Sequence, residues 1–293
     1  MMRTVFALGS ILLLLTTGLA QSEDGLPEGI TARAWAIADG RTGQLLWGVN
    51  EDIPAKAAST TKMMCAWVVL RLAEADPEIW DETVTYSKLA ASTGGSSSRL
   101  REGERVSVAE CLYGLMLPSG NDAGNALAEH FHERLEPPPG DVPQTTRSNF
   151  IAEMNRWAER LEMTRTVYRS AFGDGGTAEQ FTTTPRDLLR LAYRGMQDER
   201  FRQYVGTREH NTLVTTPDGG QRQVTWTNTN QLLVDQAFDG IKTGTTNQAG
   251  ACLVSSGRRG TDHLLVVVLG SSSSQARYTD TKALFDWAWA RRP

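Results

Sequence analysis

The feature of this sequence that most constrains its fold is the placement of short apolar segments near both ends of the chain. Residues 31–40 and 42–50 form two of them, and they are joined by a Gly-Arg-Thr-Gly turn that is typical of a β-hairpin. Three more lie in the last third of the chain, at residues 223–230, 251–257 and 262–271. Their length and patterning predict strands. We expect strands from both chain ends to pair in a single, mostly antiparallel sheet.

The long region between those segments has the periodicity of helices. We predict helices at residues 62–75, 107–117, 121–135, 149–163 and 183–196, and a closing helix at 280–292. Ser107 and Thr184 are the expected N-caps of two of them, because their hydroxyls can accept hydrogen bonds from the first helical turn. The predicted fold class is therefore α/β (α+β). A mostly antiparallel sheet built from both chain ends is flanked by helices, and a helical region is inserted between its strands.

The first 20 residues have the features of a secretory signal peptide. Arg3 supplies a positive charge, residues 5–15 form an apolar run, and residues 18–20 (Gly-Leu-Ala) have the small-x-small pattern of a cleavage site. An uncleaved anchor is the alternative, although a bilayer span needs about 20 apolar residues. We expect a signal peptide at 1–20, one domain at 21–293, and an exported, soluble protein of the periplasm or another extracytoplasmic space.

The charge and the cysteine and histidine content of the chain indicate which partners, disulfides and metal sites are to be expected. The net charge is −4 at pH 7 and no basic block occurs, so we expect no nucleic-acid partner. Cys65, Cys111 and Cys252 each lie in an apolar stretch, which predicts small buried side chains; one disulfide with a remaining thiol is the alternative. His130 and His132 are two residues apart and point to different helix faces, so we expect no metal site and no cofactor.

Ser59 and Lys62 form a polar pair at the start of the first predicted helix. The chain has only five lysines, so one in an apolar stretch calls for an explanation. A spacing of three residues puts both side chains on one helix face. A serine hydroxyl becomes a nucleophile when a base takes its proton, and a lysine can be that base if desolvation or a second cation keeps it neutral. Taken alone, the pair is better explained as a capping serine and a lysine that extends to solvent.

Two further polar motifs change that interpretation. Ser119 and Asn121 flank a glycine between the second and third predicted helices, and Lys242, Thr243 and Gly244 stand where a strand is expected to begin. The ordered set Ser-x-x-Lys, Ser-x-Asn and Lys-Thr-Gly resembles the active-site signature of penicillin-binding proteins and serine β-lactamases. The sequence contains no Gly-x-Ser-x-Gly and no His-Glu-x-x-His motif that would point to another hydrolase class.

The resemblance covers roughly residues 30–290 and is to the D-alanyl-D-alanine carboxypeptidase family, the low-molecular-mass penicillin-binding proteins. The segments that carry it are residues 39–64, 111–130, 150–163, 228–233 and 239–256. It implies a β-lactamase/transpeptidase-like fold and a serine-type D-Ala-D-Ala carboxypeptidase. The implied partners are a peptidoglycan pentapeptide as substrate and β-lactam antibiotics as covalent inhibitors.

The same resemblance assigns roles to the serines, Lys62 and Asn121. Ser59 is expected to attack the substrate carbonyl and become acylated, with Lys62 taking its proton. Ser119 is expected to relay that proton to the leaving amine. Asn121 is expected to hold Lys62 and a substrate amide by hydrogen bonds.

The Lys-Thr-Gly segment is expected to bind the other end of the substrate. Lys242 supplies a positive charge that anchors the substrate carboxylate and helps to keep Lys62 neutral. Thr243 is expected to hydrogen-bond the same carboxylate, and Gly244 lets the strand come close to the substrate. The backbone amides of Ser59 and Thr245 are the expected oxyanion hole.

Several positions depart from the family pattern. Many members carry a β-rich domain and an amphipathic tail, whereas this chain stops at Pro293, so we expect neither a C-terminal β-rich domain nor a stable membrane anchor after signal cleavage. Trp287 and Trp289 do not share one helix face, which favours packing of the closing helix onto the sheet. Glu162 stands where glycine is usual, and Thr245 where some relatives have histidine or tyrosine.

Three other functions stay open at this point. A D,D-endopeptidase would cut peptidoglycan cross-links with the same site. A class A β-lactamase would need a Glu-x-x-Leu-Asn segment after Ser-x-Asn, and the sequence contains no Leu-Asn pair. A catalytically silent muropeptide-binding protein would be expected to have lost one of the three motifs, and all three are present.

Overall fold

The five-stranded sheet of this protein is built from both ends of the chain, as predicted. The computed structural model describes residues 25–140, 144–173 and 182–292, so the predicted signal peptide lies outside the described residues. The strand order is β2-β1-β9-β8-β7, and every neighbouring pair is antiparallel. The strands are β1 (Ala34–Asp39), β2 (Leu45–Val49), β7 (Phe238–Thr246), β8 (Gly250–Arg259) and β9 (Asp262–Ser271).

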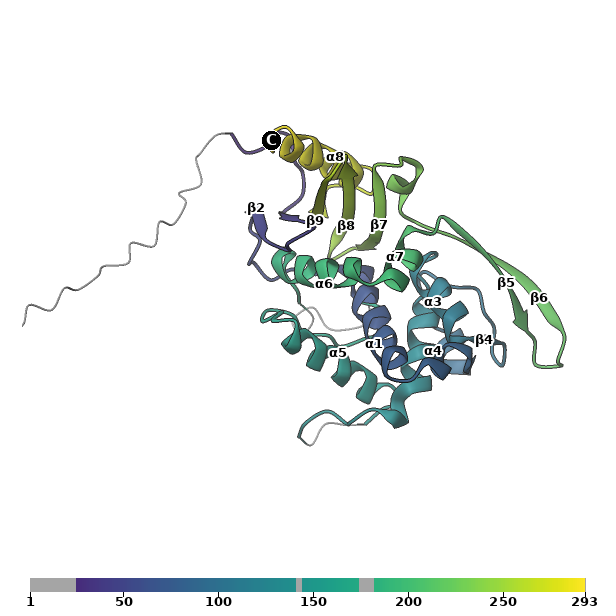
Figure 1. Cartoon of the computed structure of the whole chain (residues 1–293). Coiled ribbons are helices and arrows are strands. Elements are labelled where there is room, and N and C mark those ends of the chain that lie inside the picture. The colour runs from purple at the N-terminus through teal and green to yellow at the C-terminus, as the bar shows by residue number, and fades with distance from the viewer. Residues whose placement is uncertain (1–24, 141–143, 174–181, 293) are drawn as a thin grey trace, which may run out of the picture.

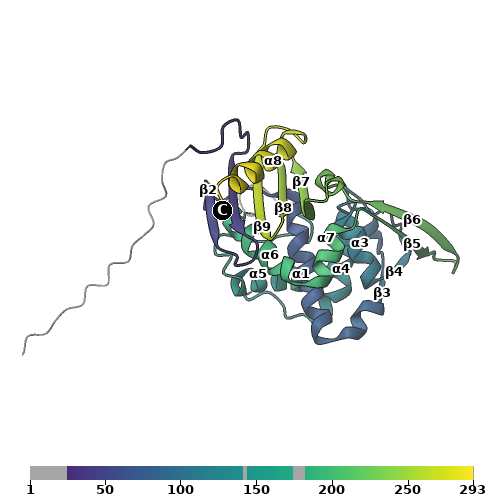
Figure 2. The same ribbon diagram turned by 45° about the horizontal axis from the view of Figure 1, so that its top comes forward.

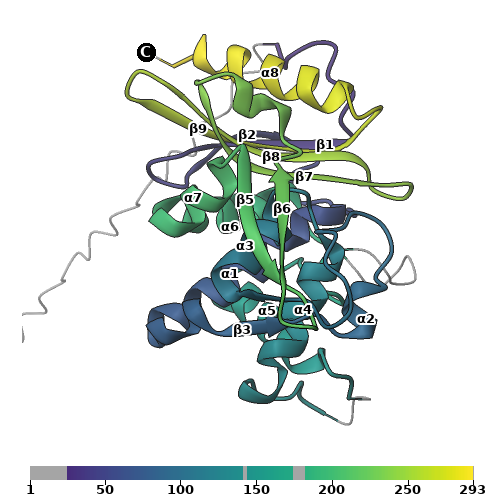
Figure 3. The ribbon, with the colours of Figure 1, turned by 90° about the vertical axis from the view of Figure 1, so that its right-hand side faces the viewer.

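Helices cover both faces of this sheet. The closing helix α8 (Ala276–Trp289) lies on one face, and α6 (Pro185–Gln197) and α7 (Glu199–Gly206) lie on the other (Figure 3). Alternate residues of β1 therefore enter different cores: Trp35 and Ile37 pack with α8, whereas Ala36 and Ala38 pack on the helical side. Burial on both faces explains why these strands are continuous apolar runs.

The inserted region is a helical body below the sheet (Figures 1 and 2). Its central helix is α1 (Lys62–Ala75), whose residues from Lys62 to Leu70 are all buried, so it shows no polar stripe. Helices α3 (Val108–Met116) and α5 (Ser148–Arg160) pack against it, α4 (Asn121–Phe131) packs on α3 and α5, and α2 (Lys88–Ala91) packs on α4. The caps at Ser107 and Thr184 are as predicted, since their side chains accept from the amides of Glu110 and Asp187. Four 3-10 turns complete the described helices: η1 (Ala58–Thr61), η2 (Pro77–Asp81), η3 (His132–Arg134) and η4 (Gln231–Val234).

The expectation of a single sheet is wrong, because a second antiparallel sheet with the order β3-β4-β5-β6 lies beside the helical body. Its strands are β3 (Thr83–Thr85), β4 (Arg105–Ser107), β5 (Glu209–Thr215) and β6 (Gln221–Thr227). Two of them have only three residues, too few to show an alternating pattern. The β5–β6 hairpin extends away from the rest of the molecule (Figure 1).

The closing helix packs on the sheet, as predicted. It begins at Ala276, earlier than the predicted start at residue 280. Phe285 and Ala288 are fully buried and Trp289 nearly so, in the cluster that fills the space between α8 and the sheet. Trp287 lies to one side, edge-on to Trp47 at 5.1 Å between ring centroids. Within the described ranges, no helix is both long and apolar enough to span a bilayer.

The three cysteines are free and buried, as expected for small apolar side chains. Burial raises the pKa of each thiol, that of Cys252 to about 11, so the thiols remain protonated at neutral pH. In the part of the chain that the structure describes, no group of three or more histidine, cysteine, aspartate or glutamate side chains is arranged to hold a metal.

Candidate active site

Ser59 lies at the junction of η1 and α1. Sequence reasoning placed it in the first turn of the α-helix, but the helix begins at Lys62 and Ser59 belongs to the 3-10 turn that precedes it. Ala58, which precedes Ser59, has a φ of 49°, which an α-helix cannot accommodate. Gly173 packs on this turn so closely that a Cβ there would lie 2.0 Å from the Ala58 carbonyl oxygen. The backbone around Ser59 is thus held in an uncommon conformation by a close neighbour.

Lys62 is the first residue of α1, and its amine contacts the Ser59 hydroxyl. The Lys62 side chain is fully buried, and Nζ lies 2.8 Å from Ser59 Oγ. The same nitrogen donates to Asn121 Oδ1 at 2.7 Å and to the Phe172 carbonyl at 3.0 Å. Three segments that are distant in the sequence therefore meet at one amine.

Ser119 and Asn121 reach this amine from the loop between α3 and α4. Asn121 is the first residue of α4, and its Nδ2 donates to the Gly94 carbonyl at 2.8 Å, which orients Oδ1 toward Lys62. Ser119 has a φ of 64° and is 4% exposed. Its Oγ has no hydrogen-bond partner among the described residues. A buried hydroxyl without a partner costs free energy, so Ser119 is well suited to receive one from a bound molecule.

A buried carboxylate supports this loop. Asp122 accepts hydrogen bonds from the Ser97 hydroxyl at 2.6 Å and from the Ser98 amide at 2.8 Å. The Asn121 amide in turn donates to the Ser96 carbonyl at 2.7 Å. Asp122 therefore ties the loop at residues 94–98 to the start of α4, next to Asn121. Sequence reasoning missed this residue, although an aspartate in the first turn of a helix was a signal for such a role.

The Lys-Thr-Gly residues lie inside β7, not at its start as expected, and β7 runs directly beside η1. A Cβ added to Gly244 would lie 2.7 Å from the Ala57 carbonyl oxygen and 3.0 Å from the Ser59 amide nitrogen. Only a glycine lets the strand come this close to the turn that holds Ser59. The close approach places the next residue, Thr245, beside the same turn.

Lys242 is buried at the centre of this strand. Its side chain is 1% exposed, and its Nζ lies 3.3 Å from the Thr243 carbonyl oxygen. Burial lowers the pKa of Lys242 well below its ordinary value, and the positive charges of Lys62 and Arg277 lower it further. A buried lysine without a counter-ion gains most from an anion that enters the site.

Arg277, in the first turn of α8, is a site residue that sequence reasoning missed. It is 8% exposed, and its Nη1 donates to the Gly244 carbonyl at 3.3 Å and to Thr245 Oγ1 at 2.8 Å. A signal existed, because Arg277 shares the buried face of the closing helix with Thr281 and Leu284, where an unpaired arginine is unusual. In the described residues, neither Arg277 nor Lys242 forms an ion pair with a carboxylate.

The structure therefore gathers all the predicted side chains into one region. Ser59, Lys62 and Asn121 are joined by hydrogen bonds, and Ser119 lies two residues from Asn121. Lys242, Thr243 and Gly244 follow one another on the adjacent strand β7, where Arg277 joins them. The Ser59 hydroxyl and the Lys62 amine thus lie beside two cationic side chains, Lys242 and Arg277. An amine beside a hydroxyl can activate an oxygen nucleophile, and cationic side chains can bind a carboxylate.

Comparison with known proteins shows which family has this sequence and this site. The family model for D-alanyl-D-alanine carboxypeptidases matches residues 20–273. A D-alanyl-D-alanine carboxypeptidase of Streptomyces sp. strain K15 is 33% identical over 98% of this chain and 97% of its own length. The D-alanyl-D-alanine carboxypeptidase DacC of Escherichia coli is 30% identical over 97% of this chain and 68% of its own.

Solved structures agree with the sequence comparison. The crystal structure of the Streptomyces K15 DD-transpeptidase superposes with a TM-score of 0.81 at 32% identity, covering 91% of this chain and all of that one. The D-alanyl-D-alanine carboxypeptidase DacD of Francisella tularensis gives 0.73 at 29% identity, covering 92% of this chain and 73% of that one. The expected β-lactamase/transpeptidase-like fold is confirmed. With the three motifs in one site and the match extending over nearly the whole described chain, this protein belongs to the D-alanyl-D-alanine carboxypeptidase family.

Proposed function

We propose that this protein removes the terminal D-alanine from peptidoglycan pentapeptides through an acyl-enzyme on Ser59. The observation that carries the proposal is the 2.8 Å separation of Lys62 Nζ from Ser59 Oγ. This distance allows direct proton transfer from the hydroxyl to the amine.

The contacts of the Lys62 amine accommodate the neutral form that a general base requires. A neutral amine has two N–H donors and one lone pair, whereas a charged one has three donors. Asn121 Oδ1 and the Phe172 carbonyl oxygen can only accept, and they occupy two donors. In the neutral form the lone pair faces the Ser59 hydroxyl, as a general base requires, whereas a charged amine would donate its third hydrogen to the same oxygen. A positive charge on Lys242 would favour the neutral form of Lys62, because two like charges this close together disfavour each other.

The substrate carboxylate would be bound at the far end of the site. Lys242 and Arg277 supply charge, and the Thr243 hydroxyl supplies a directional donor. With the carboxylate held there, the peptide bond before the last D-alanine would lie over Ser59. The required free carboxylate distinguishes the end of a stem peptide from an internal peptide bond.

The reaction would run in two steps. Ser59 Oγ forms a bond to the carbonyl carbon while its proton moves to Lys62 Nζ. The amides of Ser59 and Thr245 stabilise the oxyanion. The C–N bond then breaks, and the proton passes through Ser119 to the departing amine of D-alanine. A water molecule attacks the ester in the second step, gives one proton back to Ser59 Oγ and releases the other to solvent, which leaves a tetrapeptide with a free carboxylate. β-Lactams would enter the same first step, because they offer an amide and a carboxylate together.

We also propose that residues 1–20 are removed on export and that residues 21–293 form one catalytic domain that works outside the cytoplasm. The short apolar run at residues 5–15 and its flanking residues support this proposal.

The test of the function uses two substrates and one variant. A monomeric pentapeptide should lose one D-alanine, and Ser59→Ala should lose that activity. D-Alanine release that persists in the folded Ser59→Ala protein would contradict the proposal. A cross-linked dimer tests the endopeptidase alternative: preferential cleavage of the cross-link would make that the function.

A further inference from the structure

The Asn-Thr-Asn segment at residues 228–230 is the part of the family resemblance that the chemistry above does not use. Its two asparagines build a fixed turn between β6 and η4. Asn228 Nδ2 donates to the Thr207 carbonyl at 2.9 Å, and Asn228 Oδ1 accepts from the Asn230 amide at 2.9 Å. Asn230 Oδ1 accepts from the Leu232 amide at 3.1 Å. The turn therefore presents the residue between them, Thr229, in a set orientation.

Thr229 is bonded to three parts of the site at once. Its amide donates to the Leu117 carbonyl at 3.0 Å, two residues before Ser119. Its carbonyl accepts from the Tyr278 hydroxyl at 2.9 Å, next to Arg277. Its own hydroxyl lies 2.7 Å from the Thr243 hydroxyl. The backbone of Thr229 is therefore held on both sides, and its side chain reaches the Lys-Thr-Gly strand.

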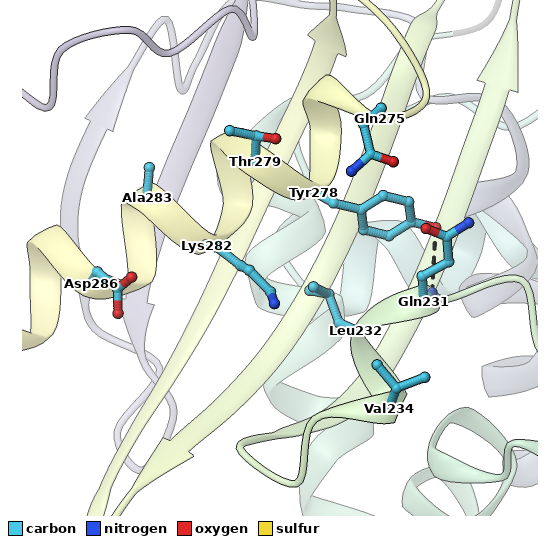
Figure 4. Close-up of a pocket in the computed structure, with 9 residues that line it drawn as sticks. All are labelled: Gln231, Leu232, Val234, Gln275, Tyr278, Thr279, Lys282, Ala283 and Asp286. Carbon is cyan, nitrogen blue, oxygen red and sulfur yellow. Dashed lines mark hydrogen bonds between the residues drawn. The ribbon is translucent and has the colours of Figure 1, made fainter.

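The Tyr278 contact is part of the packing between α8 and η4. Figure 4 shows the Tyr278 ring extending from α8 toward η4, where its hydroxyl also accepts from the Gln231 amide at 3.4 Å. Arg277 Nη2 lies 3.4 Å from the same hydroxyl. The position of Thr229 is thus tied to the helix that carries Arg277.

We propose that Thr229 is a positioning residue that orients the Thr243 hydroxyl toward the substrate carboxylate; this inference rests on the proposed function. A threonine hydroxyl has one hydrogen. If Thr243 donates its hydrogen to Thr229, Thr243 has no hydrogen left to donate to the substrate carboxylate. When Thr229 donates to Thr243, the Thr243 hydrogen points to the carboxylate, and the two hydrogen bonds strengthen each other. A bound carboxylate selects this second arrangement.

Loss of the Thr229 hydroxyl should affect substrates with a free carboxylate differently from substrates without one. Without the Thr229 hydroxyl, Thr243 loses the donor that fixes its own hydrogen, so only substrates with a free carboxylate should suffer. A hydrogen bond of this kind corresponds to about a 3- to 10-fold change in rate. Acylation by a donor whose carboxylate is capped should not change, because the Thr229 hydroxyl acts through Thr243, whose expected partner is the carboxylate.

The experiment measures kcat/KM for an acyl-D-alanyl-D-lactate and for its methyl ester, whose reactive ester bond permits acylation without the carboxylate contacts. Thr229→Val should lower the value for the free acid about 3- to 10-fold and leave that for the methyl ester within about twofold. Thr229→Ser keeps the hydroxyl and should restore the wild-type ratio. Thr227→Val, at an exposed threonine that ends β6, is the matched control and should behave as wild type.

Two results would overturn the role of Thr229. One is an unchanged ratio in Thr229→Val, and the other is an equal loss with both donors, which would indicate a purely structural residue. Failure of the proposed function would look different, because the wild-type protein itself would then show no Ser59-dependent turnover of the free acid.

Discussion

Replacing Gly244 by alanine tests how closely the carboxylate-binding strand must approach the nucleophile. The new Cβ would lie 2.7 Å from the Ala57 carbonyl oxygen, whereas ordinary contacts begin at 3.4 Å, so the strand or the turn must move by about 3.4 − 2.7 = 0.7 Å. Both clashing groups are backbone, so no side chain can rotate away. Overpacking of this kind costs roughly 1–3 kcal/mol.

The displacement should affect acylation more than stability. If β7 moves away, Lys242 and Thr243 move with it, and a misplacement of about 1 Å can reduce a rate on the order of 100-fold. We expect Gly244→Ala to lower kcat/KM about 10- to 100-fold and the melting temperature by a few degrees, at roughly 2–4 °C per kcal/mol. Stopped-flow acylation and thermal unfolding measure the two effects.

Gly206→Ala is the control for adding a methyl group, because its Cβ would meet its nearest atom at 3.3 Å, away from the site. Wild-type acylation by Gly244→Ala, with an unchanged melting temperature, would contradict this expectation. It would mean that β7 does not need the close approach seen at Ala57 and Ser59.

Three further predictions concern the base, the anchor and the N-terminus. Lys62→Arg keeps the charge but not a titratable amine, since a guanidinium pKa lies above about 12, so acylation should fall by several orders of magnitude in a protein that still folds; near-normal acylation would exclude Lys62 as the base. The pKa of Lys242 is lowered, so the free enzyme loses this positive charge at a lower pH than it would with an ordinary lysine. KM for carboxylate substrates should therefore rise as the pH increases through the pKa of Lys242. In Lys242→Arg that rise should move to higher pH, and an unshifted pH profile would contradict the assignment of Lys242 as the carboxylate anchor. N-terminal sequencing and fractionation of cells that express the full chain should find Gln21 first and the protein outside the membrane pellet; recovery in the pellet with Met1 retained would show an anchored protein.

The sequence predicted those parts of the fold and site that depend on local patterns. The helix at residues 62–75 matches α1 from end to end, because a long apolar run ends just before Pro77. The second sheet was not predictable in this way, since β3 and β4 have three residues each and are defined only by their partners.

Sequence reasoning failed where the site depends on distant contacts. Arg277 belongs to no motif, and its role follows from the packing of α8 beside β7. The hydrogen bond between Thr229 and Thr243 joins two segments whose proximity no periodicity indicates. Likewise, the motif at Ser59 could not show that Ala58 has a positive φ, because that conformation is imposed by the neighbours of the turn.

The most direct test of the account is the intact mass of the protein after exposure to penicillin. We expect one adduct for each chain, located on Ser59 by peptide mapping and absent from the folded Ser59→Ala protein. An adduct that survives this substitution, or one that maps to another residue, would contradict the central claim that Ser59 is the nucleophile.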